Sequence, residues 1–586
     1  MASNVPAETP TRGSRLTLEQ LEDRIAPAGG ILADVVGGVL VIMGDDQAND
    51  FVIDHDGLAD NQFLVSSGID STEINGGAGP ELFTDVTRGI RMTLGGGSDT
   101  ATLDGVTING NLTVDTGGGL LNQVTLIGGC TVNGSIKVVG GDGNDLITAN
   151  ALVTDNVVLA LGNGDNSFTL LGPVDGRVSV KHGVGSLDVY SAGNIGGALS
   201  ITGVSGATTI DVQGTVGHGL KIKTADGDDT ILVHDEVIAG GVSVNCGNGT
   251  DELAISLASI TGSVKFVQKD GHSNFWIANG SVSGSVKVDS GNGESHVSVI
   301  SNPVAGIVSH KGLEGMDYLY VDDSSVRAVK FRSGTGDSYA QIYGGSTVGS
   351  GGLKITNGAG SDDLRILDAT IAGPVNINNG DGDTVTYVDS STIGQGAGTR
   401  AYDYVARSRD GADAFFSTDG TFARGLVLDH GYSGSTTGLE TSTVGGNFRL
   451  LAKDGNDYMY ADTLTVTGRT AIDLGNDTSK LAIDDSGFTG AVTVKTGDAN
   501  DVISVDAEDV ASTAATVFHG KLTMLTGAGD DSITFGVEAT AGHHAEFYGN
   551  VVIDGGDGTD TVHVLGHGNI LGPEVTFLTP YVEGVV

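Results

Sequence analysis

The sequence is poor in several residue types that common protein classes need. Its 586 residues include one tryptophan, two cysteines, and only 29 lysines and arginines against 73 aspartates and glutamates, for a formal net charge of −44. So few bases argue against DNA or RNA as a partner and disfavour anionic lipid, because phosphates would be repelled. Two cysteines cannot build a disulfide framework. No run of 18 apolar residues is present, so we expect no transmembrane segment.

Glycine is in large excess, at 96 residues, where about 7% is the usual share. This excess excludes a helical bundle and an ordinary doubly wound enzyme, because interior glycine costs about 1 kcal/mol per helical site. The glycines keep no three-residue period, which excludes collagen. Valine, isoleucine and leucine recur in alternating runs, which argues against disorder. The composition therefore indicates an all-β chain with many turns.

The glycines recur in a G-x-G-x-D pattern with a regular period. We term the residue two places after the second glycine the anchor. Five consecutive anchors, Asp229, Asp251, Ser273, Ser295 and Asp317, lie 22 residues apart, and the series extends from Asp99 to Asp560. A unit of this length cannot bury its own apolar row, so such units must stack. We predict a single long parallel β-helix (β-solenoid) of about 22 residues per coil and roughly 21 coils.

One clear unit, residues 284–305, shows how a coil is built. Val286 and Val288 alternate inward on one strand, and Val297 and Val299 on the next, while glycines at the corner between them supply φ > 0. The repeat also divides the chain into four parts. Residues 1–30 are an N-terminal segment, 31–98 a cap with irregular coils, 99–505 the regular β-helix, and 506–586 its end, with lengthened coils and a C-terminal cap. Cys130 and Cys246 lie on different corners several coils apart, so we expect buried free thiols.

The N-terminal segment lacks the apolar core of a standard secretory signal. Its stretch Arg15-Leu16-Thr17-Leu18-Glu19-Gln20-Leu21-Glu22-Asp23-Arg24 resembles the RLxLExLExR motif at the N-termini of planctomycete extracellular proteins, with Asp23 where many members have proline. The resemblance covers roughly thirty residues. It implies export or a place at the cell surface, and nothing about activity. A disordered tail with one helical turn is the alternative.

Acidic residues crowd the glycine turns. The segments Gly140–Asp145 and Gly555–Asp560 resemble the GGxGxD calcium repeat of RTX-type (haemolysin-type) proteins, which implies Ca²⁺ at these turns. The family's nonapeptides run in tandem, whereas this motif occurs once per coil and Ser or Asn often replaces the aspartate. The second interpretation is that each anchor caps its own turn through a side-chain hydrogen bond. The candidate metal ligands are Asp142, Asp145, Asp228, Asp229, Asp530, Asp531, Asp557 and Asp560.

An aromatic row is predicted on the outer face of the strands that follow the anchors. Residues one and three places after an anchor point outward, and aromatic side chains gather there over about eight coils. They form either a stacking platform for sugars or a protein partner, or cross-coil packing that stabilises the sheet. The candidates are Trp276, Tyr318, Tyr320, Tyr339, Phe416, Tyr458 and Tyr460, with Arg365 among them and Tyr387 if the register holds.

Two lengthened coils follow Asp501 and Asp531 and are predicted to project from the same corner. They bring acids and histidines into one neighbourhood, where a divalent metal is one candidate ligand. Consecutive histidines diverge on a strand, however, and no HExxH spacing exists. The candidate residues are Asp506, Glu508, Asp509, Glu538, His543 and His544, with His519 nearby.

These features predict a secreted or cell-surface structural or adhesive rod without enzymatic activity. Calcium is a candidate stabilising ion, and carbohydrate or a cell-surface protein is a candidate partner. The alternative is a polysaccharide-binding or polysaccharide-degrading β-helix, a lyase or hydrolase, which would need acids beside a base on one face. Arg365, Lys354 and Lys330 are the nearest candidates for that base. With 29 bases in the chain, a base-rich groove for acidic sugars is hard to assemble.

Overall fold

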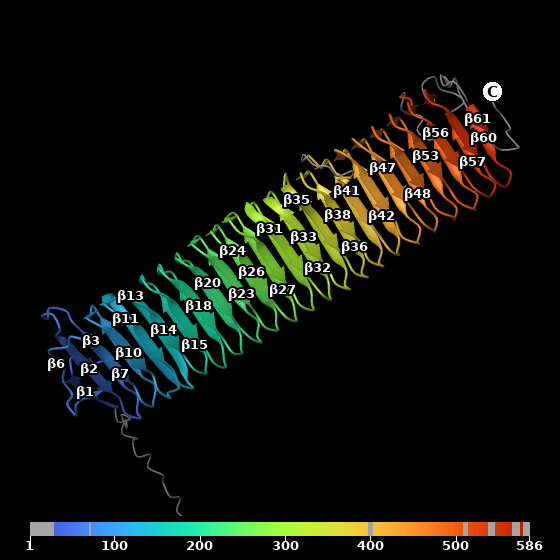
Figure 1. The fold of residues 1–586 in the computed structure, drawn as a ribbon. Coiled ribbons are helices and arrows are strands. Elements are labelled where there is room, and N and C mark those ends of the chain that lie inside the picture. The colour runs from blue at the N-terminus through green and yellow to red at the C-terminus, as the bar shows by residue number, and fades with distance from the viewer. Residues whose placement is uncertain are drawn as a thin grey trace, which may run out of the picture.

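The chain folds into a straight rod of stacked coils (Figure 1), as a computed structural model describes for residues 29–69, 72–395, 402–507, 514–536, 545–564 and 575–577. The fold is all-β, with parallel sheets stacked as a solenoid of about 19 turns, roughly 22 residues apart. The predicted fold class is confirmed. The turns are somewhat fewer than a constant period predicts because some coils are long: paired anchors Thr384 and Asp413 are 29 residues apart. No helix among the described residues is long and apolar enough to cross a membrane.

Each regular coil contributes a strand to each of two long parallel ladders, and many coils add a short strand to a third. The first ladder contains β2 (Val39–Met43), β7 (Gly89–Thr93), β10 (Asn111–Asp115), β12 (Ile136–Val139), β14 (Val157–Ala160), β16 (Val178–Lys181), β18 (Ala198–Thr202), β20 (Gly219–Lys223), β23 (Gly241–Asn245), β26 (Val264–Val267), β29 (Val286–Asp289), β31 (Val304–Lys311), β33 (Ser325–Arg332), β35 (Thr347–Thr356), β38 (Val375–Asn378), β41 (Tyr404–Arg407), β44 (Leu426–Asp429), β47 (Phe448–Leu451), β50 (Thr470–Asp473), β53 (Val492–Lys495), β56 (Leu522–Leu525), β59 (Val551–Asp554) and β61 (Val575–Phe577).

The second ladder begins at the anchors. It contains β3 (Asp50–Asp54), β8 (Thr100–Asp104), β11 (Leu121–Val132), β13 (Asn144–Val153), β15 (Asn166–Leu170), β17 (Leu187–Ser191), β19 (Thr208–Val212), β21 (Thr230–His234), β24 (Asp251–Ser256), β27 (Ser273–Ala278), β30 (Ser295–Ile300), β32 (Asp317–Asp322), β34 (Ser338–Tyr343), β36 (Asp362–Leu367), β39 (Thr384–Asp389), β42 (Asp413–Thr418), β45 (Thr436–Glu440), β48 (Tyr458–Asp462), β51 (Lys480–Asp484), β54 (Val502–Val505), β57 (Ser532–Phe535) and β60 (Thr561–Val564).

The third ladder is made of two-residue strands. It contains β9 (Thr107–Ile108), β22 (Val237–Ile238), β25 (Ser259–Ile260), β28 (Ser281–Val282), β37 (Thr370–Ile371), β40 (Thr392–Ile393), β43 (Thr421–Phe422), β46 (Thr443–Val444), β49 (Thr465–Val466), β52 (Gly487–Phe488), β55 (Val517–Phe518) and β58 (Glu546–Phe547). In the middle of the rod β31, β33 and β35 run through this corner, so that one strand serves both the third and the first ladder.

The N-terminal end of the rod is covered by antiparallel strands. β1 (Gly30–Val36) pairs antiparallel with β2, and β4 (Phe63–Ser67) pairs antiparallel with β3 and with β6 (Glu81–Phe83). β5 (Glu73–Ile74) adds a short pairing with β1. The change of strand direction ends the parallel stack here. It therefore covers a sheet edge that would otherwise be a template for aggregation.

The core is a set of stacked apolar rows, as the alternating pattern predicts. In β30, Val297 and Val299 are buried while His296 and Ser298 are half-buried on the outer face. The same alternation repeats in the paired strands above and below, so each inward residue lies on its equivalent in the next coil. Cys130 and Cys246 are buried and free, as expected.

The corners differ from the prediction in one respect. At the corner before the anchors, glycine does supply the left-handed backbone, as at Gly293 with φ 149°. At the corner after the second ladder the same conformation is taken by other residues, including Leu257, Thr441 and Thr463 with φ of 54°, 46° and 55°. Such residues are strained there. A buried hydroxyl column stabilises this corner: Asn302 N–H donates to Ser324 Oγ at 3.1 Å, and Ser324 N–H donates to Ser346 Oγ at 3.1 Å.

Candidate functional site

The anchor side chains point into the solenoid and join neighbouring coils. Asp145, Asp229 and Asp531 are at most 2% exposed, and Asp560 is 8% exposed. Anchor carboxylates accept hydrogen bonds from the anchor of the preceding coil. For example, Asp501 N–H donates to Asp531 at 2.9 Å, and Asp531 N–H donates to Asp560 at 3.2 Å. These bonds join neighbouring coils, whereas the predicted cap lies within the anchor's own turn. Asn166 makes the same inter-coil contact by accepting the N–H of Asp145 at 2.7 Å, while the Ser479 hydroxyl donates to the carbonyl of Leu474 in its own turn at 3.1 Å.

The outer turn acids form a second column that runs the other way. Asp142, Asp228, Asp530 and Asp557 are exposed. Asp228 accepts the N–H of Thr250 in the following coil at 2.8 Å, and Asp530 accepts that of Thr559 at 2.8 Å. The two members of each predicted metal pair are therefore divided between the inside and the outside of the turn. This arrangement favours capping over a shared ion.

Burial changes the proton affinity of the anchors. It raises the pKa of Asp251 and of Asp362 to about 7, and the pKa of Asp317 and of Asp531 to about 6. The second carboxyl oxygen of each of these four residues is buried without a hydrogen-bond partner. Below these pKa values the carboxyl group is protonated, which avoids the free-energy cost of an unpaired buried charge.

Two anchors and a cysteine form a group with a metal-ligand composition that was not predicted from the sequence. One donor atom each from Asp229, Cys246 and Asp251 lies within 4.8 Å of the others, and all three residues are buried. A sulfur donor suits Zn²⁺ or another transition metal and argues against Ca²⁺. Burial raises the pKa of the Cys246 thiol, so the proton is held strongly here. The approach of Cys246 to its own anchor and to the preceding one follows from the stacking, not from any motif.

The aromatic row is present on the outer face of the second ladder, and its continuous part runs from His296 to Phe416. The ring of His296 stacks on Tyr318 with centroids 4.2 Å apart, and Tyr320 lies 5.6 Å from Tyr339. The Arg365 guanidinium then lies between two rings, 5.4 Å from the centroid of Tyr339 and 5.3 Å from that of Tyr387. His296 was not among the predicted members of the row; it is brought into the stack by its pairing with Tyr318.

The row continues past Arg365. Tyr387 stacks on Phe416 with centroids 5.4 Å apart, which settles the register of Tyr387 in favour of the row. A shallow depression lies at this point, lined by Arg365, Leu367, Tyr387, Asp389, Phe416 and Thr418 among others. Tyr387 is 36% exposed. Here an aromatic face, a guanidinium and a carboxylate converge on the surface.

The remaining members lie apart from this stack. Trp276 is separated from Tyr320 by Ser298, and its indole N–H donates to Glu252 at 3.1 Å. Tyr458 and Tyr460 form their own pair, with centroids 5.7 Å apart. The Tyr460 ring covers Gly438, where an added Cβ would lie 2.4 Å from a ring carbon.

The predicted loop cluster falls mostly outside the described residues, as Glu508, Asp509, Glu538, His543 and His544 do. Asp506 is described and is buried. It accepts hydrogen bonds at 2.7 Å from the N–H and from the hydroxyl of Thr516, which closes the base of the lengthened segment. His519 stacks on Tyr548 at 5.0 Å. Asp506 thus has a structural role at this corner.

The candidate bases of a catalytic site are divided between two faces. Arg365 lies on the second ladder and is paired with Asp363 at 2.8 Å. Lys330 and Lys354 occupy paired positions on adjacent strands, on the outer side of the first ladder. The comparisons with known proteins add no family: no family model, no curated protein and no solved structure matches this chain.

Proposed function

We propose that this chain is a structural or adhesive rod without enzymatic activity, which acts outside the cell or at its surface and binds carbohydrate or a cell-surface protein. The observation that supports it best is the depression at Arg365, Tyr387 and Phe416 on a rigid ladder. Sugar rings stack on aromatic faces, and a neighbouring guanidinium and carboxylate can bond their hydroxyls. The N-terminal motif supports the proposed location.

The test is glycan binding by a Tyr387→Ala/Phe416→Ala variant. Purified protein is screened on a glycan array, and the strongest ligand is titrated by calorimetry. We expect the variant to lose at least tenfold in affinity with an unchanged melting temperature. The control is Tyr432→Ala, which removes a tyrosine that is 58% exposed on a turn outside the row. Equal affinities of the two variants would return the row to a packing role.

Location needs a separate measurement. An antibody against the rod should label intact source cells or appear in the culture medium, and deletion of residues 1–30 should retain the protein inside. Labelling only after permeabilisation would contradict the proposed location.

Calcium is a further part of the proposal, restricted to the exposed turn acids, of which Asp228 and Asp530 are examples. A ligand that binds only the folded state adds about 2.7 kcal/mol at a hundred times its Kd. Melting in millimolar calcium should therefore exceed melting in chelator, and equal midpoints would remove calcium from the proposal.

The enzymatic alternative has its own readout. A polysaccharide lyase would produce unsaturated, ultraviolet-absorbing chain ends from uronate polymers. We expect none, because Arg365 lies on the second ladder while Lys330 and Lys354 lie on the first, so the three candidate bases do not meet on one face.

A further inference from the structure

The few basic residues of this acidic chain gather on one face of the rod. Between β20 and β35, the outward positions of the first ladder carry eight of the 29 lysines and arginines of the chain. We term this surface the basic face. It comprises Lys221, Lys223, Lys265, Lys287, Lys311, Lys330, Arg332 and Lys354.

The bases form rows that follow the rod axis. In the first row the paired residues of consecutive coils are Lys221, Ser243, Lys265, Lys287, Ser309, Lys330 and Lys354. Neighbouring strands are about 4.8 Å apart, so the ammonium groups repeat at that interval wherever lysines are adjacent in the row. A straight row of positive charges on a sheet surface is complementary to a linear polyanion.

Most of this charge is not neutralised within the molecule. Asp289 is the one acid at an outward position of these strands, and it pairs with Lys287 at 3.7 Å and Lys311 at 3.3 Å. Among the described residues no carboxylate lies within 4 Å of the Lys330, Arg332 or Lys354 nitrogens. In a molecule of net charge −44, a cluster of unpaired positive charges is more typical of a surface that binds an anion than of one that only contacts solvent.

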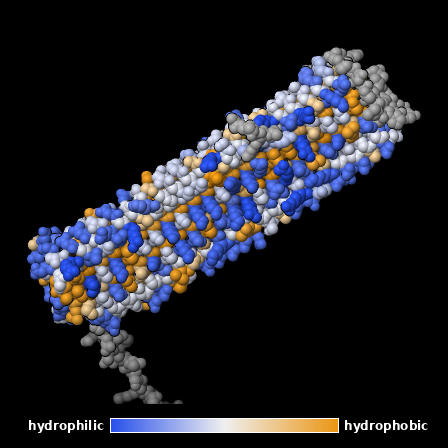
Figure 2. All heavy atoms as spheres, in the orientation of Figure 1, coloured by the Kyte–Doolittle hydropathy of each residue, from blue (hydrophilic) through white to orange (hydrophobic). Residues whose placement is uncertain are grey.

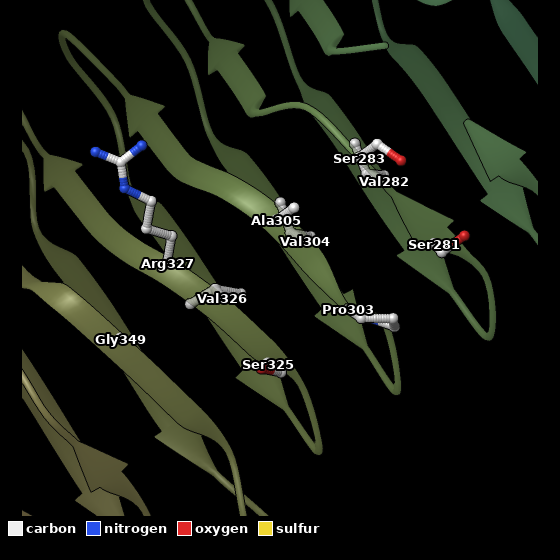
Figure 3. Close-up of a pocket in the computed structure, with 10 residues that line it drawn as sticks. All are labelled: Ser281, Val282, Ser283, Pro303, Val304, Ala305, Ser325, Val326, Arg327 and Gly349. Carbon is white, nitrogen blue, oxygen red and sulfur yellow. The ribbon is translucent and has the colours of Figure 1, made fainter. Parts of the chain in front are cut away.

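The face is also hollowed. One depression is lined by Lys311, Lys330, Arg332 and Lys354, among others, and a second by Lys221, Ser243 and Lys265. A third, at the adjoining corner, contains Arg327 (Figure 3).

The register explains the third depression. Val304 pairs with Val326 but Ile307 pairs with Ala328, so β33 has one residue fewer than β31 at the corner. Arg327 is the single residue at this corner of β33, and its neighbours, which include Ala305 and Gly349, are small. In Figure 3 its guanidinium points away from the ribbon. It adds a cation beside the basic face.

We propose that the basic face binds a linear polysaccharide that carries about one carboxylate per sugar, lying along the rod axis. A pyranose ring is about as long as the step between coils, so successive carboxylates meet successive lysines. Hydroxyls such as Ser243 and Ser309 occupy the remaining steps and suit sugar hydroxyls. The inference names a ligand class for the proposed adhesive rod, but it uses a different face from the aromatic depression.

Nucleic acid fits this face less well. A duplex carries a charge every 1.7 Å of its axis. It is wider than the four or five paired residues that each coil contributes to the first ladder, so it would overlie the acidic turns that carry Asp226, Asp228 and Asp270. Single strands bind by stacking bases on aromatic side chains. The outward residues of β20, β23, β26 and β29 are Lys, Ser, Asn, Val, Asp and Gly, without an aromatic ring.

The experiment measures binding of polygalacturonate by biolayer interferometry in chelator, which removes any bridging by calcium. The test variant is Lys265→Gln/Lys287→Gln/Lys330→Gln/Lys354→Gln. The matched control is Arg88→Gln/Arg177→Gln/Arg469→Gln/Lys521→Gln, which removes the same charge from exposed positions elsewhere on the rod. Both variants have the same net charge, so any difference between them is local.

We expect the wild type and the control variant to bind at 20 mM salt and to release at 500 mM, because screening shortens the range of these charges. The test variant should lose at least tenfold in affinity. If it fails to fold by circular dichroism, the Lys330→Gln/Lys354→Gln pair replaces it, with an expected loss of at least threefold.

Three results would overturn the inference: equal affinity of test and control variants, equal binding of neutral dextran, or equal binding of a poly(dT) oligonucleotide, which would make the face a general anion surface. The Tyr387→Ala/Phe416→Ala variant should keep wild-type affinity for polygalacturonate. Failure of the aromatic site and failure of the basic face are therefore distinguishable.

Discussion

At the scale of single residues, the anchors show how one position can be filled by different side chains. Asp229 and Asn166 each accept the N–H of the preceding coil's anchor, whereas the Ser479 hydroxyl donates to the carbonyl of Leu474 within its own turn. Aspartate differs in that it brings a charge into a buried column. Asp251 is the clearest case, since its carboxyl group faces Asp229 and the Cys246 thiol.

Replacing Asp251 with Asn should stabilise the rod at pH 8. Burial raises the folded-state pKa of Asp251 to about 7, so the folded state holds this proton more tightly than the unfolded state between about pH 4 and pH 7. Stability is therefore lost as the pH rises through that window, and Asn cannot ionise. We expect the melting temperature of the variant to exceed that of the wild type by about 1–2 °C at pH 8 and to equal it at pH 4.

Scanning calorimetry at pH 4, 6 and 8 measures this difference. Asn166 shows that an anchor position accepts an amide, so the variant should fold. Asp142→Asn, which changes an exposed turn acid on another coil, is the control for loss of one negative charge. A variant equally destabilised at every pH would mean that the amide is poorly accommodated at this position.

At the scale of the coil, some glycines are required because neighbouring turns pack closely, and others because their backbone is left-handed. The sequence pattern does not distinguish these two roles. Gly291 does not have a left-handed φ. Its Cβ, if added, would lie 1.0 Å from the carbonyl oxygen of Lys269 in the coil below. The glycine is required by the close approach of two turns.

Gly291→Ala should therefore destabilise the rod strongly, by about 3 kcal/mol, because backbone must move to admit the methyl group. Gly118 occupies the equivalent position four residues before the anchor Asn122, which pairs with Asp145, and a Cβ at Gly118 meets nothing within 4 Å. Gly118→Ala should be within about 0.5 kcal/mol of the wild type. Urea unfolding followed by circular dichroism compares the two. Equal midpoints would contradict the contact argument.

Much of the coil could be predicted from the sequence, because period and alternation are local signals. The inward valines of residues 284–305, the corner at Gly293 and the buried thiols all followed from them. The second corner did not, because its left-handed residues, such as Leu257 and Thr463, carry no glycine to mark them. The basic face also escaped prediction, since Lys265, Lys287 and Lys330 come together only through pairing between coils.

At the scale of the whole molecule, repetition distributes the surface chemistry into stripes. Figure 2 shows hydrophilic and hydrophobic residues alternating along the rod. The first ladder gathers bases and the second ladder gathers rings, while the turns between them carry acids. One side-chain choice repeated at one position of the coil becomes a continuous row, which is how a chain with few bases assembles a basic face.

Repetition also makes the rod divisible into whole coils. Each coil contacts only its neighbours, so removal of one complete unit should leave equivalent surfaces to rejoin. Val233 pairs with Ile255, and deletion of residues 233–254 therefore joins Leu232 directly to Ile255 with the inward alternation kept. We expect this 22-residue deletion to fold and to melt cooperatively within a few degrees of the wild type.

Deletion of residues 233–253 is the matched control, since it removes one residue fewer from the same strand. It places Ala254 in the inward position of Val233 and turns Ile255 toward solvent, because a shift of one residue exchanges the two faces of a strand. The short deletion should lose cooperative melting or fall by more than 10 °C. Circular dichroism melts distinguish the two, with the fluorescence of Trp276 as a second probe in both. Equal stability of the two deletions would mean that the corners absorb register errors, and the rod would then depend less on strict coil length than its pairing indicates.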